Sequence, residues 1–362
     1  PVPWDQRSEK LLTAFAGGQA PDIYGTGHGH AFGEAARGML RDITPLIEQL
    51  PDIDDFYDVV WEPSTYKGRI YGVPLIISER IIMYWKDVFA EVGLDPEAAP
   101  QSWEDIRVAT EKTTKVEGSR LERMGYQPDW GSNFGRAQAF SQYIKMNDGR
   151  LVSEDLTKPV FAGEEGLETL TFLVELYNLA QPKGVAPLTP GVIPHFSIGK
   201  IAMQRAWSGD FVWNVVRYAP DKIDDVGFFT PRKTPTSRPV AELYINGLAI
   251  SSQAKDPQLA WEFVKFLISP ENMHAYNRLY GSVSARKSEI DSDWVQKEWP
   301  QLLHWYDAME YGQTFEVMPE DSKIQETLGM EIEYALYGEK TPKKALDDAA
   351  AKIANILAET DL

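Results

Sequence analysis

The 362-residue chain contains no cysteine. This absence excludes a disulfide framework, a cysteine-ligated zinc site and a thiol nucleophile, and it is compatible with either side of a membrane. No stretch approaches about 18 consecutive apolar residues, so the sequence predicts no membrane span. The N-terminus shows no signal-peptide pattern, and we expect that any secretion signal has been removed from this sequence.

Common catalytic motifs are absent as well, including GxGxxG, GxxxxGK[ST], HExxH and GxSxG. The nearest approach is the glycine-rich stretch 25–30 (GTGHGH). Two histidines without a third clustered ligand are a weak metal signal, whereas glycines let a backbone approach a bound ligand closely. The sequence therefore predicts no catalytic residue, no metal site and no cofactor.

Basic residues are outnumbered, with 36 Lys and Arg against 54 Asp and Glu, which gives a net charge of −18. Such a surface repels phosphate backbones and anionic lipid headgroups. No Lys/Arg-rich run offsets this charge locally. We therefore expect neither nucleic acid nor a bare membrane as a partner.

Tryptophan, in contrast, is abundant: the chain has 11 Trp, and aromatic residues make up 12% of it. Tryptophan is large enough to dominate both cores and binding surfaces. We expect most of these residues to pack inside the protein, and a minority on loops to offer flat surfaces to a ligand.

The alternation of helix and strand signals predicts an α/β fold with short connections. Residues 5–16 are typical of a helix, and residues 21–24 of a strand that enters the 25–30 loop. Residues 70–83 contain two strand-like runs, divided at Pro74 and at the polar trio 78–80.

Helix starts are marked by capping residues. Ser102 precedes a helix with a carboxylate three residues on, and proline stands in the first turn after Asp256 and after Thr341. Residues 258–268 are apolar nearly all round, so we expect this helix to be buried against a sheet. The last helix should bury one stripe, formed by Ala345, Leu346, Ala349, Ile353, Ile356 and Leu357.

Ten short segments follow one another in an order and spacing that chance does not readily produce. They are residues 16–23 (AGGQAPDI), 68–74 (GRIYGVP), 84–89 (YWKDVF), 100–106 (PQSWEDI), 199–203 (GKIAM), 207–210 (WSGD), 246–251 (NGLAIS), 260–267 (AWEFVKFL), 284–286 (SAR) and 338–346 (GEKTPKKAL). Together they resemble the family-1 extracellular solute-binding proteins, the group that includes the maltodextrin-binding protein. Two positions depart from the family pattern, because Trp85 stands where Asn is usual and Ser284 where Pro is usual.

The resemblance implies a two-lobed periplasmic-binding-protein fold of type II, with a central cleft between α/β lobes joined by a multi-strand hinge. The first lobe would comprise residues 1–86 and 243–288, and the second lobe residues 87–242 and 289–362. Family members normally have a further β–α–β unit of roughly 30 residues before the segment where this chain begins. We therefore expect this unit to be missing from the sequence.

The same resemblance implies an extracytoplasmic binding protein and not an enzyme. It would capture a carbohydrate, with an oligosaccharide favoured, by lobe closure and deliver it to the permease subunits of an ABC transporter. The protein would be a monomer, either free in the periplasm or held at the cell surface as a lipoprotein.

A sugar site should combine aromatic platforms with side chains that hydrogen-bond hydroxyl groups. The candidate site residues are Trp207, Asp210, Trp130, Asp129, His28, His30, Glu79, Arg80 and Asn246. Each has a structural alternative: Asp210 could cap a helix with Trp207 in the core, Glu79 and Arg80 could form an ion pair at the hinge, and Asn246 could mark a bulge.

Two other functions stay open from the sequence. The same fold could bind a polyamine or a metal chelate, whereas the scarcity of basic residues near the candidate loops argues against an anion. A glycoside hydrolase would need two carboxylates held across a cleft, and no pattern in the sequence specifically supports such a pair.

Overall fold

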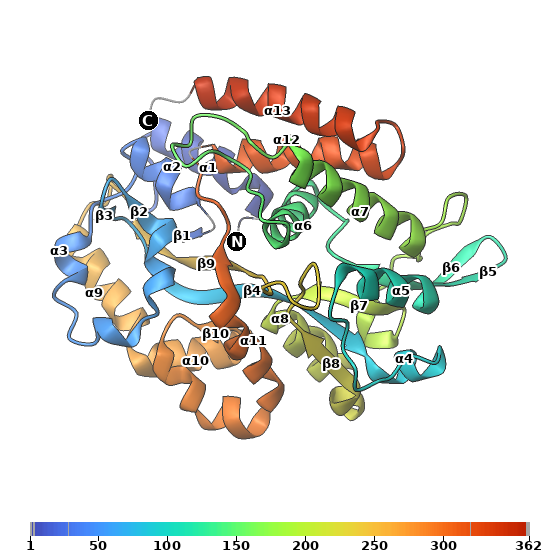
Figure 1. The fold of residues 1–362 in the computed structure, drawn as a ribbon. Coiled ribbons are helices and arrows are strands. Elements are labelled where there is room, and N and C mark those ends of the chain that lie inside the picture. Colours follow the sequence, from blue (N-terminus) through green and yellow to red (C-terminus); the bar gives the residue numbers. More distant parts are fainter. Residues whose placement is uncertain (1, 3, 28, 319, 360–362) are drawn as a thin grey trace.

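The computed structural model describes residues 2, 4–27, 29–318 and 320–359, which fold into helices packed around mainly antiparallel strands (Figure 1). The helices are α1 (Trp4–Ala16), α2 (His30–Ala36), α3 (Thr44–Ile47), α4 (Lys86–Glu91), α5 (Trp103–Thr113), α6 (Asn133–Met146), α7 (Glu164–Ala180), α8 (Ser208–Asp210), α9 (Pro257–Leu267), α10 (Pro270–Tyr280), α11 (Leu303–Ala308), α12 (Asp321–Leu336) and α13 (Pro342–Ala358). The strands are β1 (Ile23–Gly27), β2 (Thr65–Tyr66), β3 (Arg69–Ile70), β4 (Val73–Trp85), β5 (Lys115–Glu117), β6 (Arg120–Gln127), β7 (Ile201–Ala206), β8 (Val226–Phe229), β9 (Ala241–Ile250), β10 (Val283–Ser284) and β11 (Gly312–Thr314). The predicted α/β class is confirmed.

Strand β4 runs through the middle of the molecule and belongs to two groups of strands (Figure 1). Residues 73–80 pair antiparallel with β9, and β9 pairs in turn with β1. Residues 81–85 pair instead with β7 and β8, and the sheet continues from β7 to β6 and β5. The partners of β4 therefore change between Arg80 and Ile81, where the strand passes from one group of strands to the other.

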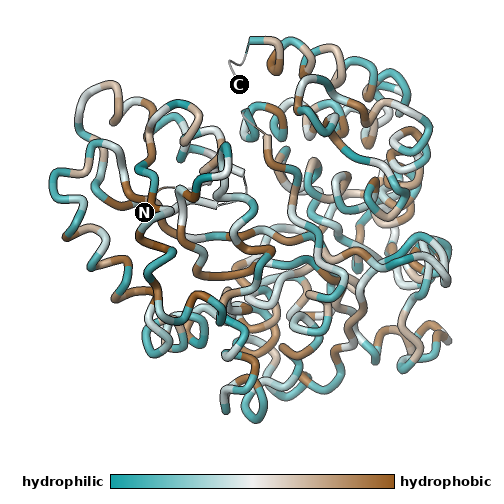
Figure 2. Tube along the Cα trace, turned by 60° about the vertical axis from the view of Figure 1, so that its left-hand side comes forward, coloured by the Kyte–Doolittle hydropathy of each residue, from teal (hydrophilic) through white to brown (hydrophobic). Residues whose placement is uncertain are grey.

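Each group of strands carries its own helices. Helix α9 packs on β9 and α2 on β1, whereas α5 and α7 pack on β6. Helices α6, α12 and α13 form a bundle with α7 and share its hydrophobic cluster. In Figure 2, hydrophobic segments follow the central strands, while the outer turns of the helices are largely hydrophilic. The arrangement is the two-lobed periplasmic-binding-protein fold.

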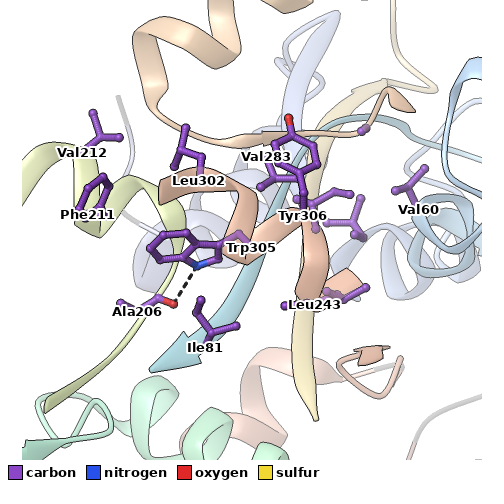
Figure 3. Packing of buried hydrophobic residues seen from close by; sticks show 14 of the residues in the cluster. Val60, Ile81, Ala206, Phe211, Val212, Leu243, Val283, Leu302, Trp305 and Tyr306 are labelled. Carbon is purple, nitrogen blue, oxygen red and sulfur yellow. Dashed lines mark hydrogen bonds between the residues drawn. The ribbon is translucent and has the colours of Figure 1, made fainter. Parts of the chain in front are cut away.

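The strands β4 and β9 bury one face in a hydrophobic cluster, which we call the core face. Ile77 and Ile81 of β4 point into it, together with Leu243 of β9. Residues 287–311, including α11, cover this face, and Trp305 lies over the paired residues Ile81 and Ala206 (Figure 3). The Trp305 indole donates a hydrogen bond to the Ala206 carbonyl at 3.3 Å. Trp305 thereby ties strands of both lobes to one layer.

The predicted helix starts are confirmed by their caps. The hydroxyl of Ser102 accepts from the Asp105 N–H at 3.1 Å, Asp256 caps α9 by accepting from Leu259 at 3.0 Å, and Thr341 caps α13. The stripe of α13 is buried at Ala345, Leu346, Ala349, Ile353 and Leu357, as its spacing predicts, with Ile356 half-buried.

Two local predictions were wrong. Residues 70–83 do not form two runs: β4 is continuous from Val73 to Trp85, and Pro74 is accommodated by a register shift. The polar trio 78–80 stays within the strand because each of its residues is paired with a residue of β9. Helix α9 is not buried all round, since only one side packs on β9 and Leu259, Phe263 and Phe266 are 66%, 52% and 59% exposed.

Candidate ligand-binding site

A cavity of about 480 Å³ lies on the side of β4 and β9 opposite the core face. Such a volume is ordinary for a small-molecule site. Its walls come from α2, β4, β9 and α10, and from α6, α12 and the turn before α8. The lining residues are His30, Ile76, Ser78, Arg80, Ser132, Phe134, Gln138, Trp207, Asn246, Tyr280 and Gln325.

The floor of the cavity is set by strand alternation. Ile76, Ser78 and Arg80 point to one side of β4, because successive side chains alternate. Asn246 of β9 stands opposite Ile76, so both strands present the same face to the cavity. We call this side the pocket face.

Arg80 is the charged group on that floor. Its Nη1 donates to the hydroxyl of Ser78 at 2.6 Å and to the Ser78 carbonyl at 3.3 Å. The guanidinium carbon lies 5.2 Å from the centre of the Tyr244 ring, within cation–π distance. Burial, together with the neighbouring charge of Arg205, lowers the pKa of Arg80 from its usual value.

The Tyr244 ring leads to a buried polar network under the floor. Glu242, fully buried, accepts from Ser141 at 2.5 Å, from Lys145 at 2.8 Å and from Arg205 at 3.2 Å. Ser141 and Lys145 lie on α6, and Arg205 lies on β7. The network fixes the strands that carry Arg80 relative to α6.

Asn246 brings an unpaired acceptor to the cavity. Its Oδ1 is buried and has no hydrogen-bond partner among the described residues. The atom lies against Gly27 of β1, where a Cβ atom would collide with it. A glycine at position 27 is therefore needed for Asn246 to take this place, and the buried oxygen has no donor among the described residues.

Trp207 and Tyr280 form an aromatic wall. Their ring centres are 5.4 Å apart with planes tilted by 46°, and Trp213 meets both rings nearly edge-on. The Trp207 indole folds over Gly209, where a Cβ atom would strike the ring. The 207–210 turn thus places a tryptophan at the cavity by using the space that glycine leaves.

Asp210 and Asp129 lie near Arg80 but do not touch it. Asp210 accepts from the Trp207 N–H at 3.2 Å, and burial raises the pKa of Asp210 to about 6 although Arg80 opposes the shift. Asp129, with a positive φ of 82°, is exposed on the loop after β6 and influences both Arg80 and Asp210 through its charge. Neither carboxylate lies within ion-pair distance of Arg80.

Of the two candidate histidines, His28 lies outside the described residues. His30 opens α2 and lines the cavity. Its Nδ1 donates to the Gly27 carbonyl at 2.5 Å, which leaves Nε2 to accept from the Ser322 hydroxyl at 3.1 Å. Burial and the charge of Arg7 lower the pKa of His30 to about 4, so the ring is neutral at pH 7.

Trp130 and Glu79 are not brought to the cavity. Trp130 is 8% exposed and packs edge-on against Tyr177 of α7, inside the cluster of the second group of helices. Glu79 points to the core face, opposite to Arg80, and is fully buried. The two residues therefore form no ion pair with each other, and burial raises the pKa of Glu79 well above its usual value.

Several lining residues escaped the sequence analysis. Gln138 of α6 and Gln325 of α12 meet across the cavity wall, with Gln138 Nε2 donating to Gln325 Oε1 at 3.2 Å. Gln325 in turn donates to Asp321, whose pKa burial raises to about 7. Tyr280 arrives from α10. None of these residues stands in a local motif, so only the tertiary contacts could reveal them.

Within the described ranges, no cluster of three or more His, Asp or Glu side chains is arranged to hold a metal ion. The helices of the same residues include none with the length and apolar character of a membrane span.

Comparisons with known proteins agree with this architecture. Residues 1–274 match the family described as "Bacterial extracellular solute-binding protein". A probable amino-acid ABC transporter periplasmic-binding protein of Sinorhizobium fredii is 22% identical over 98% of this chain and 81% of its own length. A diacetylchitobiose binding protein of Streptomyces coelicolor is 24% identical over 74% of this chain and 60% of its own.

Solved structures share the fold at similarly low identity. An ABC substrate-binding protein of Listeria monocytogenes, in complex with cycloalternan, superimposes with a TM-score of 0.83. It is 23% identical, and the superposition covers 99% of this chain and 90% of that protein.

Proposed function

The chain belongs to the family of bacterial extracellular solute-binding proteins, and from this premise we propose that it captures a carbohydrate in the cavity between its lobes. The family consists of binding proteins, so the protein is not an enzyme. Delivery of the sugar to the permease of an ABC transporter completes the proposed role.

The observation that carries the proposal is the pairing of an aromatic wall with unpaired polar groups. The C–H face of a pyranose can lie on Trp207 or Tyr280, and about 50 Å² buried there contributes on the order of 1 kcal/mol. Hydroxyl groups can bond Asn246 and Arg80, whose burial without partners would cost about 1–3 kcal/mol per group. Asp210, Asp129 and His30 complete the proposed site at its edges.

Closure of the lobes is the proposed capture step. The proposed division places residues 1–86 and 243–288 in one lobe and residues 87–242 and 289–362 in the other. Because the cavity takes walls from both groups of elements, a ligand contacts its full set of partners only in the closed form. A ligand that binds the closed form better shifts the protein toward it.

The place of action follows from the family and is extracytoplasmic. We propose a monomer, either free in the periplasm or anchored at the cell surface by a lipid. Similar proteins named as ABC transporter components support the permease as its partner.

A second candidate ligand is an amino acid. One relative is named as a probable amino-acid ABC transporter periplasmic-binding protein, and Arg80 lies within electrostatic reach of the carboxylates of Asp129 and Asp210, charges of both signs that a zwitterion requires. A sugar is favoured because the aromatic wall offers a ring face that a small amino acid does not use.

Calorimetric titration against mono- and oligosaccharides, with amino acids as a second panel, tests the proposal. We expect a sugar to bind, and Trp207→Ala to weaken it about tenfold or more through loss of stacking. Tyr337→Ala is the matched control, because this exposed tyrosine follows the far end of α12. Absence of binding to every sugar, or an unchanged affinity in Trp207→Ala, would remove sugar stacking from the account.

A further inference from the structure

Arg80 has more donors than the protein satisfies. A guanidinium carries five N–H donors, and those of Arg80 reach only Ser78, through Nη1. Among the described residues, neither Nε nor Nη2 has a hydrogen-bond partner, and no carboxylate lies within 4.0 Å of the group. Arg80 lines the cavity, so a ligand bound there can supply the missing acceptors.

The charge of the cavity is equally uneven. Arg80 is the charged side chain of its lining, because His30 is neutral and no Asp or Glu of the described residues belongs to the lining set. Ser132, Gln138, Gln325 and Asn246 supply hydroxyl and amide groups. Basic residues are scarce at the site, as the sequence analysis expected, but the one guanidinium in the lining faces no carboxylate of the lining.

The nearby carboxylates do not fill this gap. Asp210 is held by the Trp207 N–H, and Asp129 rests against Gly135, where a Cβ atom would strike the Asp129 carboxyl group. Both act on Arg80 only at longer range. A planar guanidinium with its Nε and Nη2 edge open matches a carboxylate, which accepts two parallel hydrogen bonds.

We propose that the cavity binds an acidic carbohydrate, a sugar whose ring carries a carboxylate, with Arg80 as the partner of that group. This inference rests on the proposed function, since Trp207 and Tyr280 hold the sugar ring while Arg80 selects its charge. The cation–π contact with Tyr244 and the hydrogen bonds from Nη1 to Ser78 hold the guanidinium at the floor of the cavity.

The test compares uronic-acid disaccharides with their own methyl esters by calorimetry at pH 7.5. Esterification removes the charge and retains the ring. Galacturonate, glucuronate and mannuronate disaccharides form the panel, beside neutral disaccharides. We expect one acid to bind wild type about tenfold or more tightly than its ester, and to weaken as salt screens the ion pair.

Variants separate charge from shape. Arg80→Gln should lower the affinity for the acid about tenfold or more and change the affinity for the ester by no more than about twofold. Arg80→Lys should have an intermediate affinity for the acid, because lysine keeps the charge but lacks the planar pair of N–H donors. Arg69→Gln is the matched control, because Arg69 of β3 forms an exposed ion pair with Asp42. It should change the affinity for neither the acid nor the ester. Thermal unfolding verifies that each variant is folded.

The outcomes are distinguishable. Neutral sugars that bind while every acid fails, or an acid and ester of equal affinity, overturn the acidic-sugar inference and leave carbohydrate capture intact. An acid that binds equally well to Arg80→Gln also overturns it. If no carbohydrate binds at all, or an amino acid binds in its place, both the inference and the proposed function fail.

Discussion

Glu79 and Arg80 are adjacent in sequence, yet strand β4 places them in opposite environments. Arg80 reaches the cavity, with donors left over for a ligand. Glu79 faces the hydrophobic cluster, and neither of its carboxyl oxygens has a hydrogen-bond partner among the residues the structure describes. The comparison teaches that the pocket face of this sheet offers hydrogen-bond donors to a ligand. The core face, in contrast, holds a buried carboxyl group without a hydrogen-bond partner.

The largest effect is expected from the core face, at Trp305. Trp305→Ala removes a fully buried indole and its hydrogen bond to Ala206, and should lower the free energy of unfolding by about 3–5 kcal/mol. Denaturant titration measures this loss, with Trp305→Phe as a milder control. A loss below about 1 kcal/mol would show that the 287–311 layer does not stabilise the shared strands.

Replacement of Glu79 should act in the opposite direction. Glu79→Met fills a similar volume without an unpaired carboxyl group, and should raise the free energy of unfolding by about 1–3 kcal/mol at pH 7.5. The raised pKa of Glu79 means that the folded state holds its proton where the unfolded chain has lost it, above the usual value of 4.5. Wild-type stability therefore falls as pH rises above that value.

The same variant sharpens this point through its pH profile. The stability gain of Glu79→Met should be larger at pH 7.5 than at pH 4.5, because the lost proton matters only above the unfolded pKa. Denaturant titrations at both values measure the difference. Equal gains would indicate that Glu79 finds a partner in solution.

On the pocket face, Asn246 should affect binding more than stability. Asn246→Ala removes the buried oxygen that has no donor among the described residues. The change should lower the affinity for the sugar about fivefold to tenfold. Calorimetry measures this change and thermal unfolding the stability. A variant that loses stability with unchanged affinity would place Asn246 among the structural residues.

The smallest effect is expected at Asp210. As pH rises through about 6, Asp210 loses its proton and adds negative charge near Arg80, so affinity for an acidic sugar should fall about twofold to fivefold between pH 5 and 7. Asp210→Asn should flatten this dependence. The methyl ester is the control ligand, because it carries no charge to be repelled.

The sequence could predict much of the fold because its signals are local. Helix starts are predicted from capping residues, whose side chains accept hydrogen bonds from backbone N–H groups in the first turn of the same helix. These residues are Ser102, Asp256 and Thr341. The 207–210 turn could be singled out as well, since a tryptophan close to a glycine and an aspartate is recognised as a candidate binding turn from the local sequence alone.

The remainder of the site depends on contacts between distant segments. Trp130 does stand on a turn-rich loop, but Tyr177 of α7 covers it. Which of Glu79 and Arg80 faces the cavity depends on the register of β4 against β9, which shifts between Pro74 and Ile76. Tyr280 and Gln325 reach the cavity only because α10 and α12 pack where they do.

The continuity of β4 has a consequence for how this chain can vary. A single residue inserted or deleted between Ile76 and Glu79 would reverse the facing of the following side chains in the strand, so that Glu79 would face the cavity and Arg80 the core face. The number of residues in this segment is therefore constrained by the packing on both faces of the strand. Exposed loops elsewhere carry no such constraint on their length.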